Sequence, residues 1–173
     1  MRPSIYWLDL TESGPEGRPE RWRLAIMPRP RAGGWLEDEI AGWKAEGVDM
    51  VVGLLEPHEL AELELNRLPA TCAAAGIDFV PFPIADRGVP ASLPETDRLV
   101  CTIAADLAAG KAVAVHCRSG IGRSALIAAC VLVRGGYAVD SAFATIGLAR
   151  GVEVPDTEAQ RAWVAAFLAA TSE

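Results

Sequence analysis

The segment from His116 to Ser124 constrains the fold of this chain more than any other feature. It reads His-Cys-Arg-Ser-Gly-Ile-Gly-Arg-Ser, follows the apolar run 112–115 and opens the longer apolar run 125–132. A short apolar run, a bend with two glycines and a longer apolar run predict a strand, a tight loop and a helix. Glycine lets the backbone fold back so that successive N–H groups point inward, and the helix N-terminus adds positive potential. The segment therefore predicts an anion-binding loop between a strand and a helix.

A cysteine and an arginine separated by five residues make this loop chemically specific. Cys117 is the candidate nucleophile, because the field that binds an anion also stabilises a thiolate. Arg123 could place a guanidinium fork on two phosphate oxygens, which a lysine cannot do. Ser124 is placed to hydrogen-bond the thiolate. As ordinary structural residues, Cys117 would be a small buried side chain and Arg123 a first-turn helix residue that the helix dipole disfavours.

The rest of the chain alternates between short apolar runs and helical patterns. This alternation predicts a three-layer α/β sandwich with a central, mostly parallel sheet of about five strands flanked by helices. We expect a single domain over 1–173, with 1–34 as an N-terminal strand or hairpin extension packed on it and a turn at 13–19. Strands are predicted at 5–8, 22–27, 48–55, 77–82 and 112–115, and helices at 35–46, 59–65, 68–75, 94–109, 123–134, 139–149 and 157–170.

Asp86 is the second candidate for catalysis. It follows the predicted strand 77–82, as Cys117 follows the strand 112–115. Because the carboxyl ends of parallel strands meet at one edge of a sheet, we expect both residues to lie on the same edge. Asp-x-Gly alone is ordinary turn chemistry, so the prediction for Asp86 depends on the loop at Cys117.

The charge balance excludes several classes of partner. The chain has 16 lysine and arginine against 23 aspartate and glutamate residues, a net charge of −7. Such a chain is not expected to bind nucleic acid or a membrane surface in a general way, although a local pocket can still be positive. Segment 1–10 does not resemble a signal peptide, and no apolar run is long enough to span a bilayer. We therefore expect a soluble, cytoplasmic protein.

The four cysteines form neither a metal-binding nor a disulfide pattern. They occur at positions 72, 101, 117 and 130, with no Cys-x-x-Cys pair and no zinc-like spacing. In a chain of this length they are typical of reduced thiols in a cytosolic protein. Cys72, Cys101 and Cys130 lie in apolar or alanine-rich stretches, so we expect buried structural thiols. No metal site is predicted.

Two motifs in a defined order resemble a known family. His-Cys-x5-Arg-Ser after a strand resembles the signature loop of the cysteine-dependent protein tyrosine phosphatases. The segment 83–90, Pro-Ile-Ala-Asp-Arg-Gly-Val-Pro, is similar to the general-acid loop of compact dual-specificity-type members, especially the kinase-associated phosphatase and its bacterial relatives. The resemblance extends from about residue 48 to the C-terminal helices. Low-molecular-weight tyrosine phosphatases differ, because their cysteine comes early and their aspartate late.

The resemblance implies a role for each matching residue. Cys117 would form a cysteinyl-phosphate, and Asp86 would protonate the leaving group and then accept a proton from water. Ser124 would ease the departure of the thiolate, and His116 would order the loop and stabilise the thiolate. No cofactor or metal is implied. The phosphate would be bound by loop residues Arg118, Ser119, Gly120, Ile121 and Gly122 and by the side chain of Arg123.

Two further roles come from the same resemblance. Glu56 or Glu59, just past the strand that ends at residue 55, could brace the phosphate-binding arginine as an acidic residue does in relatives. Relatives often carry a Gln-Thr-x-x-Gln segment that positions the hydrolytic water. Here the matching stretch is 156–160, in which Gln160 is retained while Asp156 replaces the first glutamine. Thr157 could equally cap a helix.

The sequence favours a phosphoprotein phosphatase that acts on phosphotyrosine, with or without phosphoserine and phosphothreonine. The alternative substrate is a phosphoinositide, an RNA 5′-phosphate or a small metabolite. Such substrates usually require several basic residues around the loop. Here the loop has only Arg118 besides Arg123, with Arg87 and Arg150 nearby. A non-catalytic phosphate-binding module is disfavoured because Cys117 and Asp86 are both present. A dinucleotide fingerprint over 120–125, with Asp140 as the ribose-binding acid, would need a second strand before Asp140, and only residues 137–139 are available for it.

Overall fold

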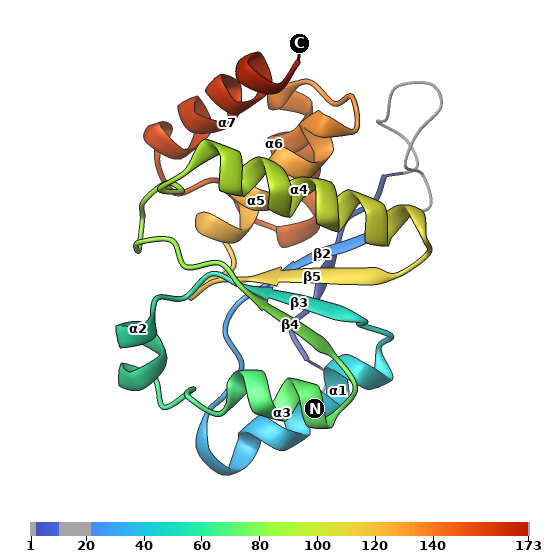
Figure 1. Cartoon of the computed structure of the whole chain (residues 1–173), viewed down its shortest axis with the longest axis vertical. Coiled ribbons are helices and arrows are strands. Elements are labelled where there is room, and N and C mark those ends of the chain that lie inside the picture. The colour runs from blue at the N-terminus through green and yellow to red at the C-terminus, as the bar shows by residue number, and fades with distance from the viewer. Residues whose placement is uncertain (1–2, 11–21, 173) are drawn as a thin grey trace.

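The computed structural model describes residues 3–10 and 22–172, and this part of the chain forms a three-layer α/β sandwich (Figure 1). Its strands span Tyr6–Trp7 (β1), Arg23–Met27 (β2), Met50–Gly53 (β3), Asp78–Pro81 (β4) and Ala112–His116 (β5). They form one sheet in the order β1-β2-β5-β3-β4, in which only the β1–β2 pair is antiparallel. The predicted fold class is confirmed. Strand β2, predicted as part of an N-terminal extension, lies inside the sheet between β1 and β5.

The central strand β5 is buried along its whole length. Its sequence, Ala-Val-Ala-Val-His, is nearly continuous in apolar residues, as a strand covered on both faces requires. Successive side chains point to opposite faces. Val113 and Val115 therefore pack in one core cluster, and Ala114 packs in the other. This division places a hydrophobic core on each side of the sheet.

Four helices cover the face to which Val113 and Val115 point (Figure 1). They are α4 (Leu93–Ala108), α5 (Arg123–Arg134), α6 (Val139–Arg150) and α7 (Glu158–Thr171). Helix α5 is the central one, because α4, α6 and α7 all pack against it. Its residues 123–133 are all buried, so the helix that follows the anion-binding loop is held on every side.

The other face of the sheet carries a smaller layer (Figure 1). It contains the short 3-10 helix Gly33–Trp35, α1 (Leu36–Ala45) and α3 (Leu68–Ala74). Trp43 of α1 and Leu68 of α3 are buried in the core on this side. Helix α2 (Pro57–Glu62) lies at the edge of the sheet where β3 ends, and its Leu60 packs against the core on this side.

The predicted strands and helices occur within a few residues of their expected bounds, but one burial prediction is wrong. Cys101 is exposed on α4, whereas Cys72 and Cys130 are buried as expected. Val100 and Ile103 take the buried face of α4 beside Cys101, so the thiol points to the outer face. The turn predicted at 13–19 lies outside the described residues. In the part of the chain that is described, no helix is long and apolar enough to cross a bilayer.

Candidate active site

The loop that carries Cys117 lies at the carboxyl edge of the sheet, directly after β5. His116 ends β5 and pairs with Met27 of β2 on one side and with Gly53 of β3 on the other. The N–H of Cys117 donates to the carbonyl of Met27 at 3.4 Å, so the loop leaves the sheet between two neighbouring strands. Helix α5 then begins at Arg123. The predicted strand, loop and helix are confirmed.

The loop backbone presents N–H groups that have no acceptor. Gly120 has a φ of +70°, and a Cβ there would lie 2.8 Å from backbone atoms of Met27 and Pro28, so glycine is required for this turn. The Gly120 N–H itself donates to Sγ of Cys117 at 3.3 Å. Four other loop N–H groups donate to nothing among residues 3–10 and 22–172: those of Arg118, Ser119, Ile121 and Gly122. Free N–H groups at a helix N-terminus make an anion-binding cradle.

The sulfur of Cys117 lies at the floor of this cradle. The side chain is only 2% exposed, so reagents reach it through the cradle alone. Oγ of Ser124 lies 3.3 Å from Sγ, where its hydroxyl can donate to a thiolate. Ser124 is fully buried in the first turn of α5, which holds the hydroxyl in place. The structure therefore brings together the predicted nucleophile and the predicted hydroxyl.

Arg123 is held by three groups, which occupy four of its five N–H donors. Its Nη1 donates to Oε2 of Glu59 at 2.7 Å and to the carbonyl of Ile84 at 2.8 Å. Its Nη2 donates to Oε1 of Glu59 at 2.9 Å and to Oδ1 of Asp86 at 3.2 Å. The Nε–H has no acceptor among the described residues. Along the Nε–Nη2 edge of the guanidinium, Asp86 is therefore the only acceptor among the described residues.

The surroundings of Glu59 and Arg123 favour the charged form of both side chains. Burial raises the pKa of Glu59. This effect is outweighed by the hydrogen bonds from Arg123 and from the backbone of Glu56 and by the charges of Arg123 and Arg118. The pKa of Glu59 is therefore below its ordinary value. Burial lowers the pKa of Arg123, but Glu59 outweighs this effect, with help from the charges of Cys117 and Asp86, and the pKa is raised. Of the two acidic residues considered from the sequence, Glu59 is the brace. Glu56 caps α2 instead.

His116 is completely buried behind the loop. Burial lowers the pKa of His116 to about 4, and the charge of Arg123 also lowers it, against the smaller raising effects of the Cys117 carbonyl and Glu59. The ring is therefore neutral near pH 7. Its Nδ1 lies 3.3 Å from the carbonyl oxygen of Cys117, which can only accept, so we assign the proton to Nδ1. This contact orders the peptide bond of the nucleophile.

The loop that carries Asp86 lies at the same edge, as predicted. The Asp86 side chain is 52% exposed, and its contact with Arg123 holds it over the cradle. The Gly88 N–H donates to the Ala85 carbonyl at 2.7 Å, which closes the turn around the carboxylate. Arg87, between them, has a φ of +59° and is exposed.

Gln160 links the Asp86 loop to the nucleophile loop. Its Nε2 donates to the Gly88 carbonyl at 3.1 Å, and its Oε1 accepts from the N–H groups of Asp156 and Thr157 at 3.0 and 3.2 Å. A Cβ on Gly122 would lie 3.1 Å from Nε2 of Gln160 and 2.7 Å from Oδ2 of Asp156, so both side chains border the cradle. Thr157 is the N-cap of α7. The role of Gln160 in positioning water stays a prediction.

Arg150 supports the loop from outside. Its Nε donates to the Gly120 carbonyl at 3.1 Å and its Nη2 to the Ser119 carbonyl at 3.2 Å. The guanidinium also lies 4.4 Å from the ring centre of Tyr6. These bonds hold two loop carbonyls away from the cradle. From sequence, Arg150 is expected only near the site, and the structure shows that its donors hold the loop itself.

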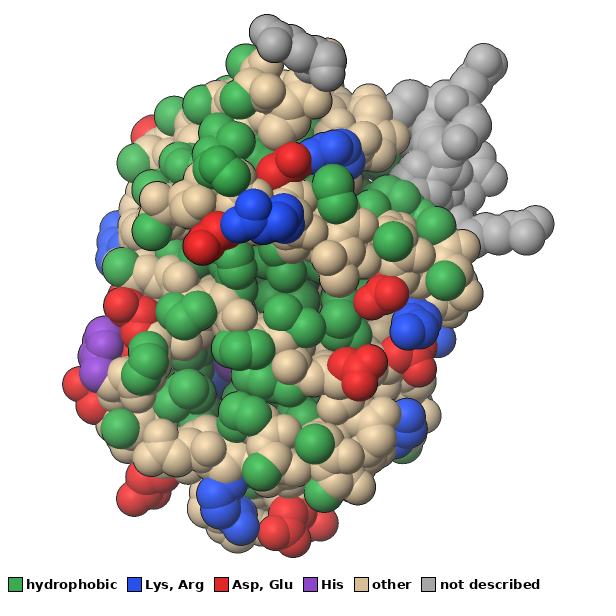
Figure 2. All heavy atoms as spheres, viewed as in Figure 1, with side chains coloured by type: hydrophobic (Ala, Val, Ile, Leu, Met, Phe, Trp, Pro, Cys, Tyr) green, Lys and Arg blue, Asp and Glu red, His purple; other side chains and the backbone are tan. Residues whose placement is uncertain are grey.

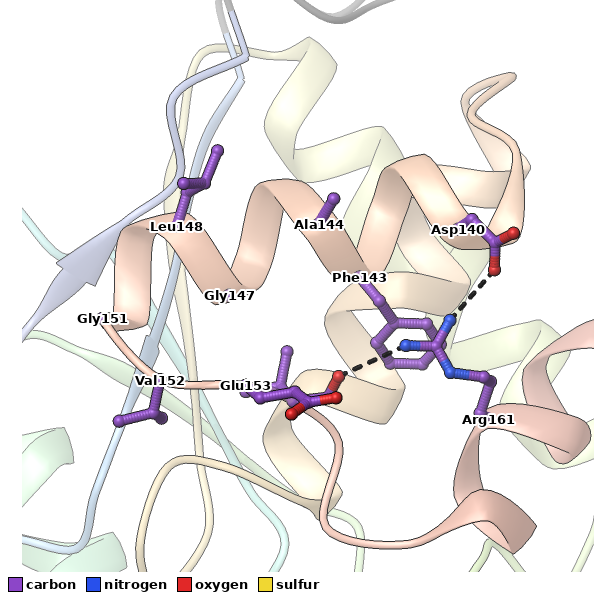
Figure 3. A pocket seen from close by; sticks show the side chains of 10 residues that line it. Asp140, Phe143, Ala144, Gly147, Leu148, Gly151, Val152, Glu153 and Arg161 are labelled. Carbon is purple, nitrogen blue, oxygen red and sulfur yellow. Dashed lines mark hydrogen bonds and ion pairs between the residues drawn. The ribbon is translucent and has the colours of Figure 1, made fainter.

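A groove lies elsewhere on the protein, between α6, the segment after it and the start of α7 (Figure 3). Its volume is about 820 Å³, and none of the predicted site residues lines it. Arg161 crosses it, with Nη1 3.0 Å from Asp140 and the guanidinium 4.7 Å from the ring centre of Phe143. Because Asp140 belongs to α6 and residues 137–139 form no strand, the dinucleotide alternative is wrong. In the described residues, no cluster of His, Cys, Asp and Glu is arranged to hold a metal ion.

The chain is similar to known proteins at the level of sequence. A family model described as "Polymorphic toxin system, DSP-PTPase phosphatase" matches residues 25–137. The protein tyrosine phosphatase domain-containing protein 1 of Bos taurus is 34% identical over 102 residues, which make up 54% of this chain and 13% of that protein. The chain therefore spans only a small part of that relative's length.

Solved structures share the whole architecture. The kinase associated phosphatase with its catalytic cysteine replaced by serine has a TM-score of 0.86 and 20% identity, over 99% of this chain and 97% of that chain. Tk-PTP in the active form has a TM-score of 0.73 and 25% identity, over 99% of both chains. PTPMT1 in complex with PI(5)P has a TM-score of 0.73 and 21% identity, over 90% of this chain and 97% of that chain. These matches show the same fold, and the family model over residues 25–137 confirms the resemblance predicted from the two motifs.

Proposed function

We propose that this chain, which belongs to the DSP-PTPase phosphatase family of polymorphic toxin systems and is a cysteine-based phosphatase, hydrolyses phosphotyrosine in proteins, with or without phosphoserine and phosphothreonine. The free donors around Cys117 carry this proposal. Four loop N–H groups and the Nε–H of Arg123 lack acceptors within the described part of the chain, and together they match the oxygens of a phosphate group.

In the first step, the Cys117 thiolate attacks phosphorus opposite the leaving oxygen. The S–P bond forms as the P–O bond to the leaving group breaks. The loop N–H groups and the Nε–Nη2 edge of Arg123 bind the equatorial oxygens, so the phosphate takes the place of the Asp86 carboxylate on Nη2. Released from Arg123, Asp86 in its acid form donates its proton to the leaving oxygen, and it regains a proton from water in the second step. Glu59 stays on the opposite side of the guanidinium and holds it in position.

In the second step, water attacks the cysteinyl-phosphate. The O–P bond forms as the S–P bond breaks, and Asp86 accepts the proton of the water. Ser124 donates to the departing thiolate, from its position 3.3 Å away. Gln160 uses one Nε2 hydrogen for Gly88, and its second amide hydrogen is the group that could orient the water.

The charge of the chain supports a protein substrate. At a net charge of −7, the chain would be repelled by anionic membranes and by RNA. The complex of PTPMT1 with PI(5)P shows that a related fold can hold a phosphoinositide. The substrate panel must therefore contain lipid and nucleic-acid phosphates as competitors.

The test is a panel of a phosphotyrosine peptide, a phosphothreonine peptide, short-chain PI(5)P and a 5′-phosphorylated RNA. The wild-type protein should hydrolyse the phosphotyrosine peptide fastest, and Cys117→Ser should abolish turnover while the unfolding transition is retained. Cys101→Ser is the matched control and should keep full activity, because this exposed thiol lies on α4. A phosphotyrosine peptide that binds without turnover would favour the non-catalytic module, and faster lipid or RNA hydrolysis would overturn the protein assignment.

A further inference from the structure

Arg150, at the end of α6, directs its guanidinium to the phosphate-binding loop rather than to a carboxylate. Elsewhere, Figure 2 shows several lysine and arginine side chains beside acidic groups on the face it presents. Within residues 3–10 and 22–172, Arg150 has no ion pair, and its donors go to the carbonyls of Gly120 at 3.1 Å and Ser119 at 3.2 Å. Its positive charge therefore lies beside the cradle without a counter-charge.

The two carbonyls that Arg150 holds set the direction of two loop N–H groups. In a trans peptide unit, the C=O and the N–H point to opposite sides of the chain. The carbonyl of Ser119 shares its peptide unit with the N–H of Gly120, which donates to Sγ of Cys117 at 3.3 Å. The carbonyl of Gly120 shares its unit with the N–H of Ile121, a cradle donor that has no acceptor among the described residues. With both carbonyls held outside, one N–H points to the sulfur and the other into the cradle.

Gly120 is the reason why these two peptide units need to be held. It lies between them and has a φ of +70°. Glycine adopts either sign of φ at little cost, so the peptide units on both sides of it can rotate more easily than elsewhere in the loop. A rotated unit would turn a carbonyl oxygen toward the phosphate and remove an N–H donor. The hydrogen bonds from Arg150 oppose this rotation.

The position of Arg150 depends in turn on the N-terminal strand. Its guanidinium lies 4.4 Å from the ring centre of Tyr6 in β1, and both side chains are half-buried. This cation–π contact restricts a long side chain that otherwise has many rotamers. The Tyr6 hydroxyl makes no hydrogen bond within the described part of the chain, so Tyr6 contributes the face of its ring. Tyr6 and Arg150 both lie outside residues 25–137, which the family model matches.

We propose that Arg150 and Tyr6 are positioning residues for the phosphate-binding loop, so that strand β1 completes the candidate active site. This proposal rests on the proposed function, because it concerns the donors that would bind the phosphate of the substrate. Arginine suits the role, since its planar fork carries donors in fixed directions and reaches two carbonyls at once, whereas lysine ends in a point charge. Both residues act through the loop backbone and need no contact with the substrate.

The test measures phosphate binding without turnover. Inorganic phosphate should protect Cys117 from iodoacetamide, because the buried thiol is reached only through the cradle, and the concentration dependence gives Kd. A Cys101→Ser background removes the exposed thiol that would also react. Tyr6→Leu should weaken phosphate binding about 5-fold, as expected for the loss of one half-buried cation–π contact. Arg150→Met, which loses both hydrogen bonds, should weaken it about 10-fold or more.

Three variants separate positioning from packing. Tyr6→Phe keeps the ring and should keep the wild-type Kd for phosphate. Trp7→Leu removes the neighbouring cation–π contact of the same strand, in which the Arg23 guanidinium lies 4.9 Å from the Trp7 ring centre. Because Arg23 donates to the carbonyl of Glu46 and not to the loop, Trp7→Leu should leave the Kd unchanged even if stability falls. Arg150→Lys keeps the charge but can hold only one carbonyl in place, so its Kd should lie between those of Arg150→Met and the wild type.

The outcomes separate this proposal from the function on which it rests. If the wild type binds phosphate with the expected order of variants but hydrolyses no phosphate ester, the proposed function fails and the positioning role is supported. If Tyr6→Leu is folded by urea unfolding and binds phosphate as tightly as the wild type, the role of Tyr6 is overturned. Equal losses in Trp7→Leu and Tyr6→Leu would also overturn it, since they would report on the packing of β1. An unchanged Kd in Arg150→Lys and Arg150→Met would overturn the role of Arg150.

Discussion

Two carboxylates contact the guanidinium of Arg123, and their surroundings differ sharply. Glu59 is 2% exposed, makes two short bonds to the arginine and accepts a third from the Glu56 N–H at 2.9 Å. Asp86 is 52% exposed and makes one bond of 3.2 Å. Burial and the number of hydrogen bonds, rather than residue type, therefore separate a fixed carboxylate from one that can move. The fixed group can hold the arginine, and the movable group is free to transfer a proton.

Removal of the fixed charge should have the largest effect. Glu59→Gln leaves the buried Arg123 with only the half-exposed Asp86 as a counter-charge, and we expect a loss of about 3–5 kcal/mol in the free energy of unfolding. Urea unfolding followed by fluorescence measures this loss. The amide oxygen can still accept one hydrogen bond, so the loss reports mainly on charge.

The matched control is Glu39→Gln, which breaks the more exposed pair with Arg31, joined at 2.6 Å. This pair should contribute at most about 1 kcal/mol. Equal losses in the two variants would mean that burial does not distinguish the Arg123 pair from an ordinary surface pair.

Removal of the movable charge should leave stability nearly unchanged and reduce activity instead. Asp86→Asn should slow hydrolysis of alkyl phosphates and other poor leaving groups by about 10²-fold or more, because these groups need a proton as they depart. Substrates with electron-poor phenols should be slowed far less. The measurement is kcat/KM across a series of leaving-group pKa values, with urea unfolding as the stability control. If the loss were the same at every leaving-group pKa, Asp86 would not be the general acid.

The part of the site that could be predicted from sequence is the part that local patterns encode. Cys117, Arg123 and Ser124 lie in one strand–loop–helix segment, so their spacing alone sets their arrangement. Asp86 could be placed because the ends of parallel strands meet at one edge. Glu59 could not be chosen over Glu56, because both follow β3 and only the start of α2 decides which carboxylate reaches the arginine.

Other features depended on the order of strands or on helix phase. The hydrogen bond from the Arg29 N–H to the Arg118 carbonyl could not be predicted, because it requires that β2 pairs with β5, and strand order has no local signal in the sequence. Cys101 was misplaced for a different reason. The alanine-rich composition around it predicts burial, whereas the apolar period of α4, with Val100 and Ile103 buried, places Cys101 on the outer face.

His116 is buried like Glu59, but its burial suppresses its charge, so the imidazole stays neutral. Its pKa falls from the ordinary 6.5 to about 4 on folding, chiefly because of burial. Between these values the unfolded chain binds a proton that the folded protein does not, so stability is fully present above pH 6.5 and falls as the pH decreases. The lowered pKa of Glu59 stabilises the fold, and this contribution is lost only as the pH falls below the unfolded value of 4.5. Between pH 6.5 and 4.5, the effect of His116 on stability is therefore separate from that of Glu59.

Across that interval, the wild type should lose about 2 kcal/mol of unfolding free energy through this one group, at roughly 1.4 kcal/mol per pH unit. His116→Asn retains an amide N–H that can donate to the Cys117 carbonyl but has no proton to gain, so this part of the pH dependence should disappear. The measurement is urea unfolding at a series of pH values. His58→Asn is the control and should keep the wild-type slope, because His58 is exposed on α2. If both variants kept that slope, the proton uptake would belong to other groups, and burial of His116 would not oppose its charge.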